Sequence, residues 1–167
     1  MKITRATQTL RVEFFKTLPR SETTGISVLY TDTVADPRID AAAMDYSDAM
    51  RGFFGCAYHY LIKATGEVEI GRDPTTRTSR GYAAYREFNV MVGVDGGRDA
   101  EGNRVQTVTT EQREAVEWLL QSIANVLQVP LEISGNIAGL YDDPDDVTDL
   151  DDPEDDEQDD PDLPLVG

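Results

Sequence analysis

Short apolar runs alternate with polar turns along the chain, and this pattern predicts a sheet packed against helices. Runs of four to six residues rich in β-branched and aromatic side chains favour buried strands. Two of them flank Thr65-Gly66, which predicts a β-hairpin with Gly66 at a positive φ angle. The predicted strands are 26–30, 58–63, 67–70, 89–94 and 131–133.

Two segments have the features of helices. Residues 39–51 are rich in alanine and end at Gly52, a residue that commonly stops a helix. Residues 109–127 begin with Thr109 and Gln112, which can form a capping box. Six apolar side chains of this second helix recur at helical spacing and predict one buried face: Val116, Leu119, Leu120, Ile123, Val126 and Leu127.

The predicted elements follow the order β-α-β-β-β-α-β. Strands mixed with helices in this way indicate an α/β fold with a mixed central β-sheet flanked by helices. The chain of 167 residues is long enough for about one domain with a single core. We expect an N-terminal extension at 1–21, the globular domain at 22–141 and a separate tail at 142–167.

The net charge of −17 comes mostly from the end of the chain. Residues 142–167 hold 14 of the 32 acidic side chains and no basic one, so 18 acidic and 15 basic residues remain in 1–141, a net charge of −3. The tail repeats Asp-Asp-Pro, and repulsion between its carboxylates favours a disordered or extended chain.

This acidic tail predicts a basic protein surface as its partner. The candidate contact residues are Asp151, Asp152, Asp155, Asp156, Leu163 and Leu165. Direct binding to nucleic acid is not expected because the carboxylates would repel phosphates, whereas mimicry of nucleic acid by the tail stays open. No run approaches the ~20 apolar residues of a membrane helix, and no signal peptide is evident, so we expect the virion or the host cytoplasm as the location.

The chain has a single cysteine, Cys56, and a single histidine, His59. A lone thiol cannot form an internal disulfide, and without other ligands nearby it is a poor metal centre. We therefore expect Cys56 to be buried and inert. His59 is expected to be a structural residue held by hydrogen bonds.

Residues 58–73 read Tyr-His-Tyr-Leu-Ile-Lys-Ala-Thr-Gly-Glu-Val-Glu-Ile-Gly-Arg-Asp. This segment resembles the signature hairpin of zinc-dependent N-acetylmuramoyl-L-alanine amidases, a family that includes small podoviral lysozymes and the peptidoglycan recognition proteins. The order of the other elements agrees, so the resemblance extends over 22–137. It implies the fold of these amidases, and it implies that Arg72 pairs with a carboxylate or a backbone carbonyl.

The resemblance also implies a zinc ion held by two histidines and a third cysteine or aspartate. Leu29 takes the position of the first ligand, and residues 133–136 offer no imidazole for the second. Only Asp142 and Asp143 offer a donor for the third. Tyr58 matches the catalytic tyrosine of the family. We therefore expect no zinc, no other cofactor and no enzymatic activity.

The segment that follows the hairpin differs from the family, because tyrosine and arginine replace the expected small residues and histidine. These two residue types are enriched at protein interfaces. The candidate contact residues in this loop are Arg80, Tyr82, Tyr85 and Arg86.

These observations together predict a catalytically inactive phage protein with an amidase fold. Its expected role is a structural or protein-interaction component of a virion, with the tail bound to a basic partner. Two alternatives stay open. One is a regulator or inhibitor of a phage or host enzyme, such as a polymerase. The other is a peptidoglycan-binding protein or a residual amidase.

Overall fold

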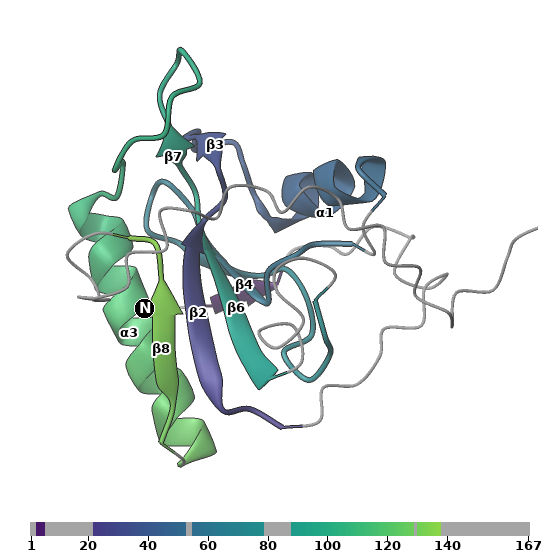
Figure 1. Cartoon of the computed structure of the whole chain (residues 1–167), viewed down its shortest axis with the longest axis vertical. Coiled ribbons are helices and arrows are strands. Elements are labelled where there is room, and N and C mark those ends of the chain that lie inside the picture. Colours follow the sequence, from purple (N-terminus) through teal and green to yellow (C-terminus); the bar gives the residue numbers. More distant parts are fainter. Residues whose placement is uncertain (1–2, 6–21, 53–54, 79–87, 129, 138–167) are drawn as a thin grey trace, which may run out of the picture.

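The protein is built around one mixed β-sheet (Figure 1). The computed structural model describes residues 3–5, 22–52, 55–78, 88–128 and 130–137. The sheet has six strands in the order β1-β5-β4-β6-β2-β8, and a separate two-stranded sheet joins β3 to β7. The strands are β1 (Ile3–Arg5), β2 (Gly25–Tyr30), β3 (Thr33–Val34), β4 (Tyr60–Ile62), β5 (Val68–Ile70), β6 (Asn89–Val94), β7 (Gly97–Arg98) and β8 (Glu132–Gly135). The helices are α1 (Ala41–Met50) and α3 (Thr110–Leu127).

Strand β2 lies inside the sheet and pairs in parallel with β6 on one side and with β8 on the other. Among the described strands of the six-stranded sheet, β4 and β5 form the antiparallel pair, and this pair is the predicted hairpin with Gly66 at φ 79°. The α/β fold with a mixed sheet and flanking helices is thereby confirmed. The structure also shows β1, β3 and β7, which were not predicted because none of them lies in a run of apolar residues.

Strand β1 comes from the segment that we expected to be an extension of the domain. It pairs in parallel with β5, with Ile3 opposite Val68, and so adds an edge strand to the sheet. The boundaries of the extension and of the tail stay predictions.

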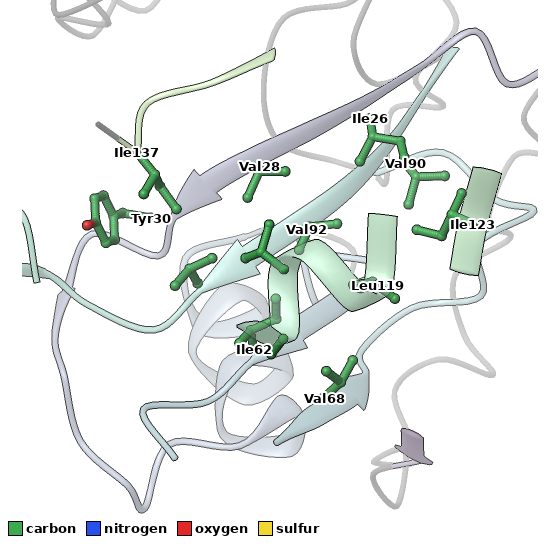
Figure 2. Packing of buried hydrophobic residues seen from close by; sticks show 13 residues of the cluster. Ile26, Val28, Tyr30, Ile62, Val68, Val90, Val92, Leu119, Ile123 and Ile137 are labelled. Carbon is green, nitrogen blue, oxygen red and sulfur yellow. The ribbon is translucent and has the colours of Figure 1, made fainter. Parts of the chain in front are cut away.

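Helix α3 covers one face of the sheet (Figure 2). It begins with the predicted capping box, in which the Thr109 hydroxyl accepts a hydrogen bond from the Gln112 amide and the Gln112 side chain accepts one from the Thr109 amide. Its buried apolar residues pack on every second side chain of the strands. These residues are Ala115, Val116, Leu119 and Ile123 from the helix, and Ile26, Val28, Ile62, Val68, Val90 and Val92 from the sheet.

Of the six apolar residues predicted for that face, Leu120 and Leu127 are partly buried and one is exposed. Val126 is 80% exposed, although it points in the same direction as Leu119 around the helix. It lies one turn beyond the last buried residue, Ile123, in the final turn of the helix. A periodic sequence pattern gives the direction of a face and does not show where its covering layer ends.

Helix α1 covers the opposite face. Ala41 and Met44 of this helix pack with Tyr58, Leu61 and Met91, which point away from α3. Asp45 and Asp48 hold the helix to the segment before β4, since their carboxylates accept hydrogen bonds from the amides of Cys56 at 2.9 Å and Ala57 at 2.8 Å. The sheet therefore lies between two helical layers.

Within the ranges given above, no helix has the length and apolar character that crossing a membrane requires.

Candidate functional site

Polar side chains gather where β2, β6 and β8 end. These three strands are parallel, so their carboxyl ends meet at one edge of the sheet. The pair β3–β7 lies beyond this edge, directly after β2 and β6 in the chain (Figure 1). Ligands of α/β proteins bind preferentially outside the carboxyl ends of such strands. We therefore take this edge, which we call the β2–β6 edge, as the candidate site.

A buried carboxylate, Asp95, follows β6 at this edge and is 0% exposed. Its two oxygens accept hydrogen bonds from the Thr33 hydroxyl at 2.9 Å and from the Asp36 amide at 3.0 Å. Burial raises the pKa of Asp95 above its usual value, and these two hydrogen bonds oppose the rise. Asp95 thus ties the chain that follows β2 to the end of β6.

The two threonines after β2 form a directed chain of hydrogen bonds. Thr33 donates its hydroxyl hydrogen to Asp95, so the 2.7 Å contact between Thr31 and Thr33 has Thr31 as the donor. Thr31 in turn accepts a hydrogen bond from the Gly96 amide at 3.2 Å. The backbone at the β2–β6 edge is therefore held in one arrangement.

Tyr58 lies beneath this edge, 3% exposed. Its ring lies against Gly93 of β6, where an added Cβ atom would come within 2.7 Å of the ring. Its hydroxyl donates a hydrogen bond to the Tyr30 carbonyl at 3.4 Å, at the last residue of β2. The structure thus places the tyrosine identified from the sequence at the candidate site, but buried.

Leu29 occupies the position that the resemblance assigns to the first zinc ligand. Its side chain is partly buried and packs on the apolar cluster that contains Tyr58 and Met91. A leucine offers no donor atom, so this position contributes packing alone.

The stretch 133–136 holds the last strand to β2. The side-chain oxygen of Asn136 accepts a hydrogen bond from the Tyr30 amide at 3.0 Å, and the hydroxyls of Ser134 and Ser27 are 3.0 Å apart. The residues in the region of the second ligand are therefore engaged with β2.

Both ring nitrogens of His59 are also engaged. Nδ1 accepts a hydrogen bond from the Met91 amide at 2.8 Å, so Nε2 carries the hydrogen and donates it to the Thr76 carbonyl at 2.7 Å. The ring is 0% exposed. This confirms the structural role predicted for His59.

These donors do not fit a zinc ion. Among the described residues no three side chains of the histidine, cysteine, aspartate or glutamate type lie close enough together to hold a metal. Cys56 is buried, as predicted, and burial raises the pKa of its thiol to about 12, whereas zinc binds the thiolate. Asp142 and Asp143 lie outside the described residues.

Arg72 has the kind of partners that the resemblance implied. Its Nε atom donates to the Cys56 carbonyl at 2.8 Å, and Nη1 donates to the Arg77 carbonyl at 2.7 Å. Two predicted contact surfaces lie outside the described residues and stay predictions. They are the loop residues Arg80, Tyr82, Tyr85 and Arg86, and the tail residues Asp151, Asp152, Asp155, Asp156, Leu163 and Leu165.

Several polar residues of the edge were missed by the reasoning from sequence. Asp32 has a left-handed backbone with φ 61° and accepts a hydrogen bond from Arg98 at 2.6 Å. Asp95 had a usable signal, because a charged residue directly follows the apolar run 89–94. Asp32 and Arg98 are 66 positions apart, and no sequence pattern showed that they meet.

Comparison with known proteins places the chain in a family. No family model matches the sequence. The chain is, however, 32% identical over 110 residues to the endolysin of Klebsiella phage KP32, and the match covers 66% of this chain and 70% of that protein. The chain belongs to the phage endolysin family.

Solved structures with the same fold include two types of protein. The N-acetylmuramoyl-L-alanine amidase LysCS from Clostridium intestinale URNW superposes with a TM-score of 0.60 at 17% identity, over 80% of each chain. The Drosophila peptidoglycan recognition protein SD superposes with a TM-score of 0.63 at 16% identity, over 81% of this chain and 82% of that protein. This endolysin-family chain therefore has the fold that the hairpin at 58–73 predicted.

The relationship overturns two expectations from the sequence. The chain was expected to be an inactive structural component of a virion and not an enzyme. Both expectations are wrong, because the relative that is 32% identical to this chain over 110 residues is an endolysin. They were inferred from the missing histidines at two ligand positions. That inference gave too little weight to the similarity of the rest of the chain.

Proposed function

We propose that this chain acts on the bacterial cell wall as an endolysin, with peptidoglycan as its ligand. The observation that carries the proposal is the 32% identity to a phage endolysin over two thirds of the chain. The fold shared with an N-acetylmuramoyl-L-alanine amidase and with a peptidoglycan recognition protein adds support.

The β2–β6 edge is the place where we expect the wall to bind. Peptidoglycan presents amides, hydroxyls and carboxylates. A protein site that binds it therefore needs both hydrogen-bond donors and cationic groups. Asn136 is exposed at the end of β8, Thr33 is partly exposed after β2, and Arg98 is partly exposed in β7. The hydrogen bonds around Asp95 hold Thr33 in place before any ligand arrives.

The proposal includes binding to the wall without a histidine-bound zinc ion. It is supported by Leu29, which has no donor atom, and by Asn136, whose side-chain oxygen already accepts a hydrogen bond from Tyr30. His59 supports it as well, because both of its nitrogens are engaged. We assign no step of hydrolysis to a metal.

A sedimentation assay with the full chain and insoluble peptidoglycan tests this function. We expect the protein to be retained in the pellet, the turbidity of the suspension to fall, and stem peptides to appear in the supernatant. Insoluble chitin is the control, since it has a related sugar backbone and no peptides. Equal retention on chitin, or no retention on peptidoglycan, would show that the proposal is wrong.

Two matched variants test whether the β2–β6 edge is the part of the molecule that binds peptidoglycan. Thr33→Val removes the hydroxyl that donates to Asp95 and should weaken retention. Thr75→Val removes a hydroxyl that donates to Asp73 in the turn after β5, and should leave retention unchanged. This turn is at the opposite edge, because β5 runs antiparallel to β4 and β4 is parallel to β6. Thermal unfolding of both variants checks that they are folded.

A further inference from the structure

A hairpin beyond the β2–β6 edge brings two arginines together. Residues 97–105 fold back on themselves, with hydrogen bonds from the Val105 amide to the Gly97 carbonyl at 2.9 Å and from Asp99 to Asn103 at 3.0 Å. Arg98 and Arg104 pair directly across this hairpin. Like charges at directly opposite positions destabilise a β pair.

One carboxylate lies between these two guanidinium groups. Arg98 donates from Nη2 to Asp32 at 2.6 Å, and Arg104 Nε is 3.9 Å from the other oxygen of Asp32. The three groups together carry a net charge of +1. The side chains of Asp32 and Arg98 are each 34% exposed and that of Arg104 is 55% exposed, so a ligand can reach all three.

The backbone of Asp32 is also unfavourable, in addition to the pairing of the two arginines. Its φ angle of 61° is in the left-handed region, which non-glycine residues seldom adopt. Residues held in such conformations are concentrated at functional sites. A strained residue and an incompletely neutralised pair of like charges thus occur together, next to Thr31 and Thr33 of the candidate site.

The other exposed arginine pair near this edge is different. Arg38 binds Asp36 through both oxygens of the carboxylate, one arginine to one aspartate, and has no excess charge. The group of Asp32, Arg98 and Arg104 has two cations and one carboxylate, whereas the Arg38 pair has one of each.

We propose that Arg98 and Arg104, positioned by Asp32, bind a free carboxylate of the peptidoglycan stem peptide. A carboxylate fits because the guanidinium group presents parallel N–H donors at the spacing of two carboxylate oxygens. Arg98 uses one N–H for Asp32 and one for the Gly102 carbonyl, and it has five in total. This inference rests on the proposed function and adds to it the chemical group that is recognised.

Binding of a soluble stem peptide to the full chain tests the inference. Isothermal titration calorimetry would compare a stem tetrapeptide that has free carboxylates with the same peptide amidated at those groups. We expect the free form to bind more tightly, and Arg104→Gln to weaken its binding roughly fivefold to tenfold, as for the loss of one charge-assisted contact. Arg38→Gln is the matched control and should leave the dissociation constant unchanged.

Two results would overturn the inference: equal binding of the amidated peptide, or an unchanged dissociation constant for Arg104→Gln. Arg104 makes only a 3.9 Å contact with Asp32, so its replacement should leave the fold intact, and thermal unfolding checks this. Retention on insoluble peptidoglycan is measured in parallel. If wild type and Arg104→Gln are retained equally, the carboxylate site fails and the proposed function stands, whereas loss of retention by wild type is a failure of the proposed function itself.

Discussion

Cys56 lies in the cluster between α1 and the sheet, where it is 1% exposed. Burial raises the pKa of its thiol to about 12, because a thiolate there would lose its hydration, and the nearby carboxylates of Asp48 and Asp45 add to the rise. The reactive thiolate is therefore almost absent at neutral pH. Among single residues, this thiol gives a direct measure of whether the cluster is closed.

We predict that Cys56 does not react with a thiol reagent such as 5,5′-dithiobis(2-nitrobenzoic acid) in the native protein at pH 8. In guanidinium chloride one thiol per chain should react, since the chain has a single cysteine. The absorbance of the released dye measures both. Reaction of the native protein at the rate of a free thiol would contradict the burial of Cys56.

Asp36 provides a second prediction for a single residue. The pKa of its carboxyl is lowered from 3.8 to about 2, mainly by the hydrogen bonds from the Arg38 side chain and then by the Arg38 amide. A lowered pKa means that the carboxylate stabilises the fold above about pH 3.8, and that this contribution is lost as the pH falls through about 2.

A titration followed by nuclear magnetic resonance of the carboxyl carbon measures this pKa. Arg38→Gln should bring it back towards 3.8, because the charged hydrogen bonds are gone. An unchanged pKa in the variant would show that another group lowers it.

For single residues, the sequence showed which zinc ligands are missing. It did not show which contacts the residues at those positions make instead. The lack of imidazole at position 29 and in 133–136 was visible directly. The packing of Leu29 beside Tyr58 and the hydrogen bond from Tyr30 to Asn136 were not, because each joins segments far apart in the sequence. Asp32 was missed for the same reason, since both of its arginines lie more than 60 positions away.

Among the elements, α3 illustrates how a local signal can be tested. Its capping box satisfies two backbone amides that have no partner within the helix. We predict that Thr109→Ala lowers the free energy of unfolding by about 0.5–2 kcal/mol. Chemical denaturation of the full chain measures the loss. Thr110→Ala is the matched control, as Thr110 is exposed at the first position of the helix, and an equal effect of both changes would count against the cap.

The longer elements could be predicted from local sequence signals. Strand β6 was found from a continuous apolar run, α1 from its alanine content and Gly52, and α3 from helical spacing and a capping box, each to within about two residues. The sheet order could not be predicted, because the parallel pairing of β2 with β8 joins Gly25 to Glu132. How far the buried face extends along α3 could not be predicted either, since Val126 fits the apolar pattern and is exposed.

For the whole molecule, metal dependence is the property that tests whether this chain differs from the zinc amidases that it resembles. We predict that the full purified chain contains no stoichiometric zinc, and that neither added zinc nor a chelator shifts its thermal unfolding temperature. A ligand that binds the native state at 100 times its dissociation constant stabilises that state by about 2.7 kcal/mol, which a thermal scan detects readily. One zinc per chain by elemental analysis would contradict this.

A variant with two added imidazole ligands provides a positive control for this test. Leu29→His with Asn136→His places one imidazole at the position of the first ligand and one within 133–136, the region of the second. Added zinc should raise the unfolding temperature of the double variant relative to the same variant with chelator. The wild type measured in the same way is the control.

The parallel pairing of β2 with β8 also means that the sheet cannot be completed until the end of the chain has been synthesised. Strand β8 follows α3, so its partner edge on β2 is synthesised more than 100 residues earlier and stays unpaired until β8 emerges from the ribosome. Non-local pairing of this kind slows folding, and a bare strand edge is a template for aggregation. A nascent or truncated chain that ends before residue 132 is therefore the form most in need of a chaperone.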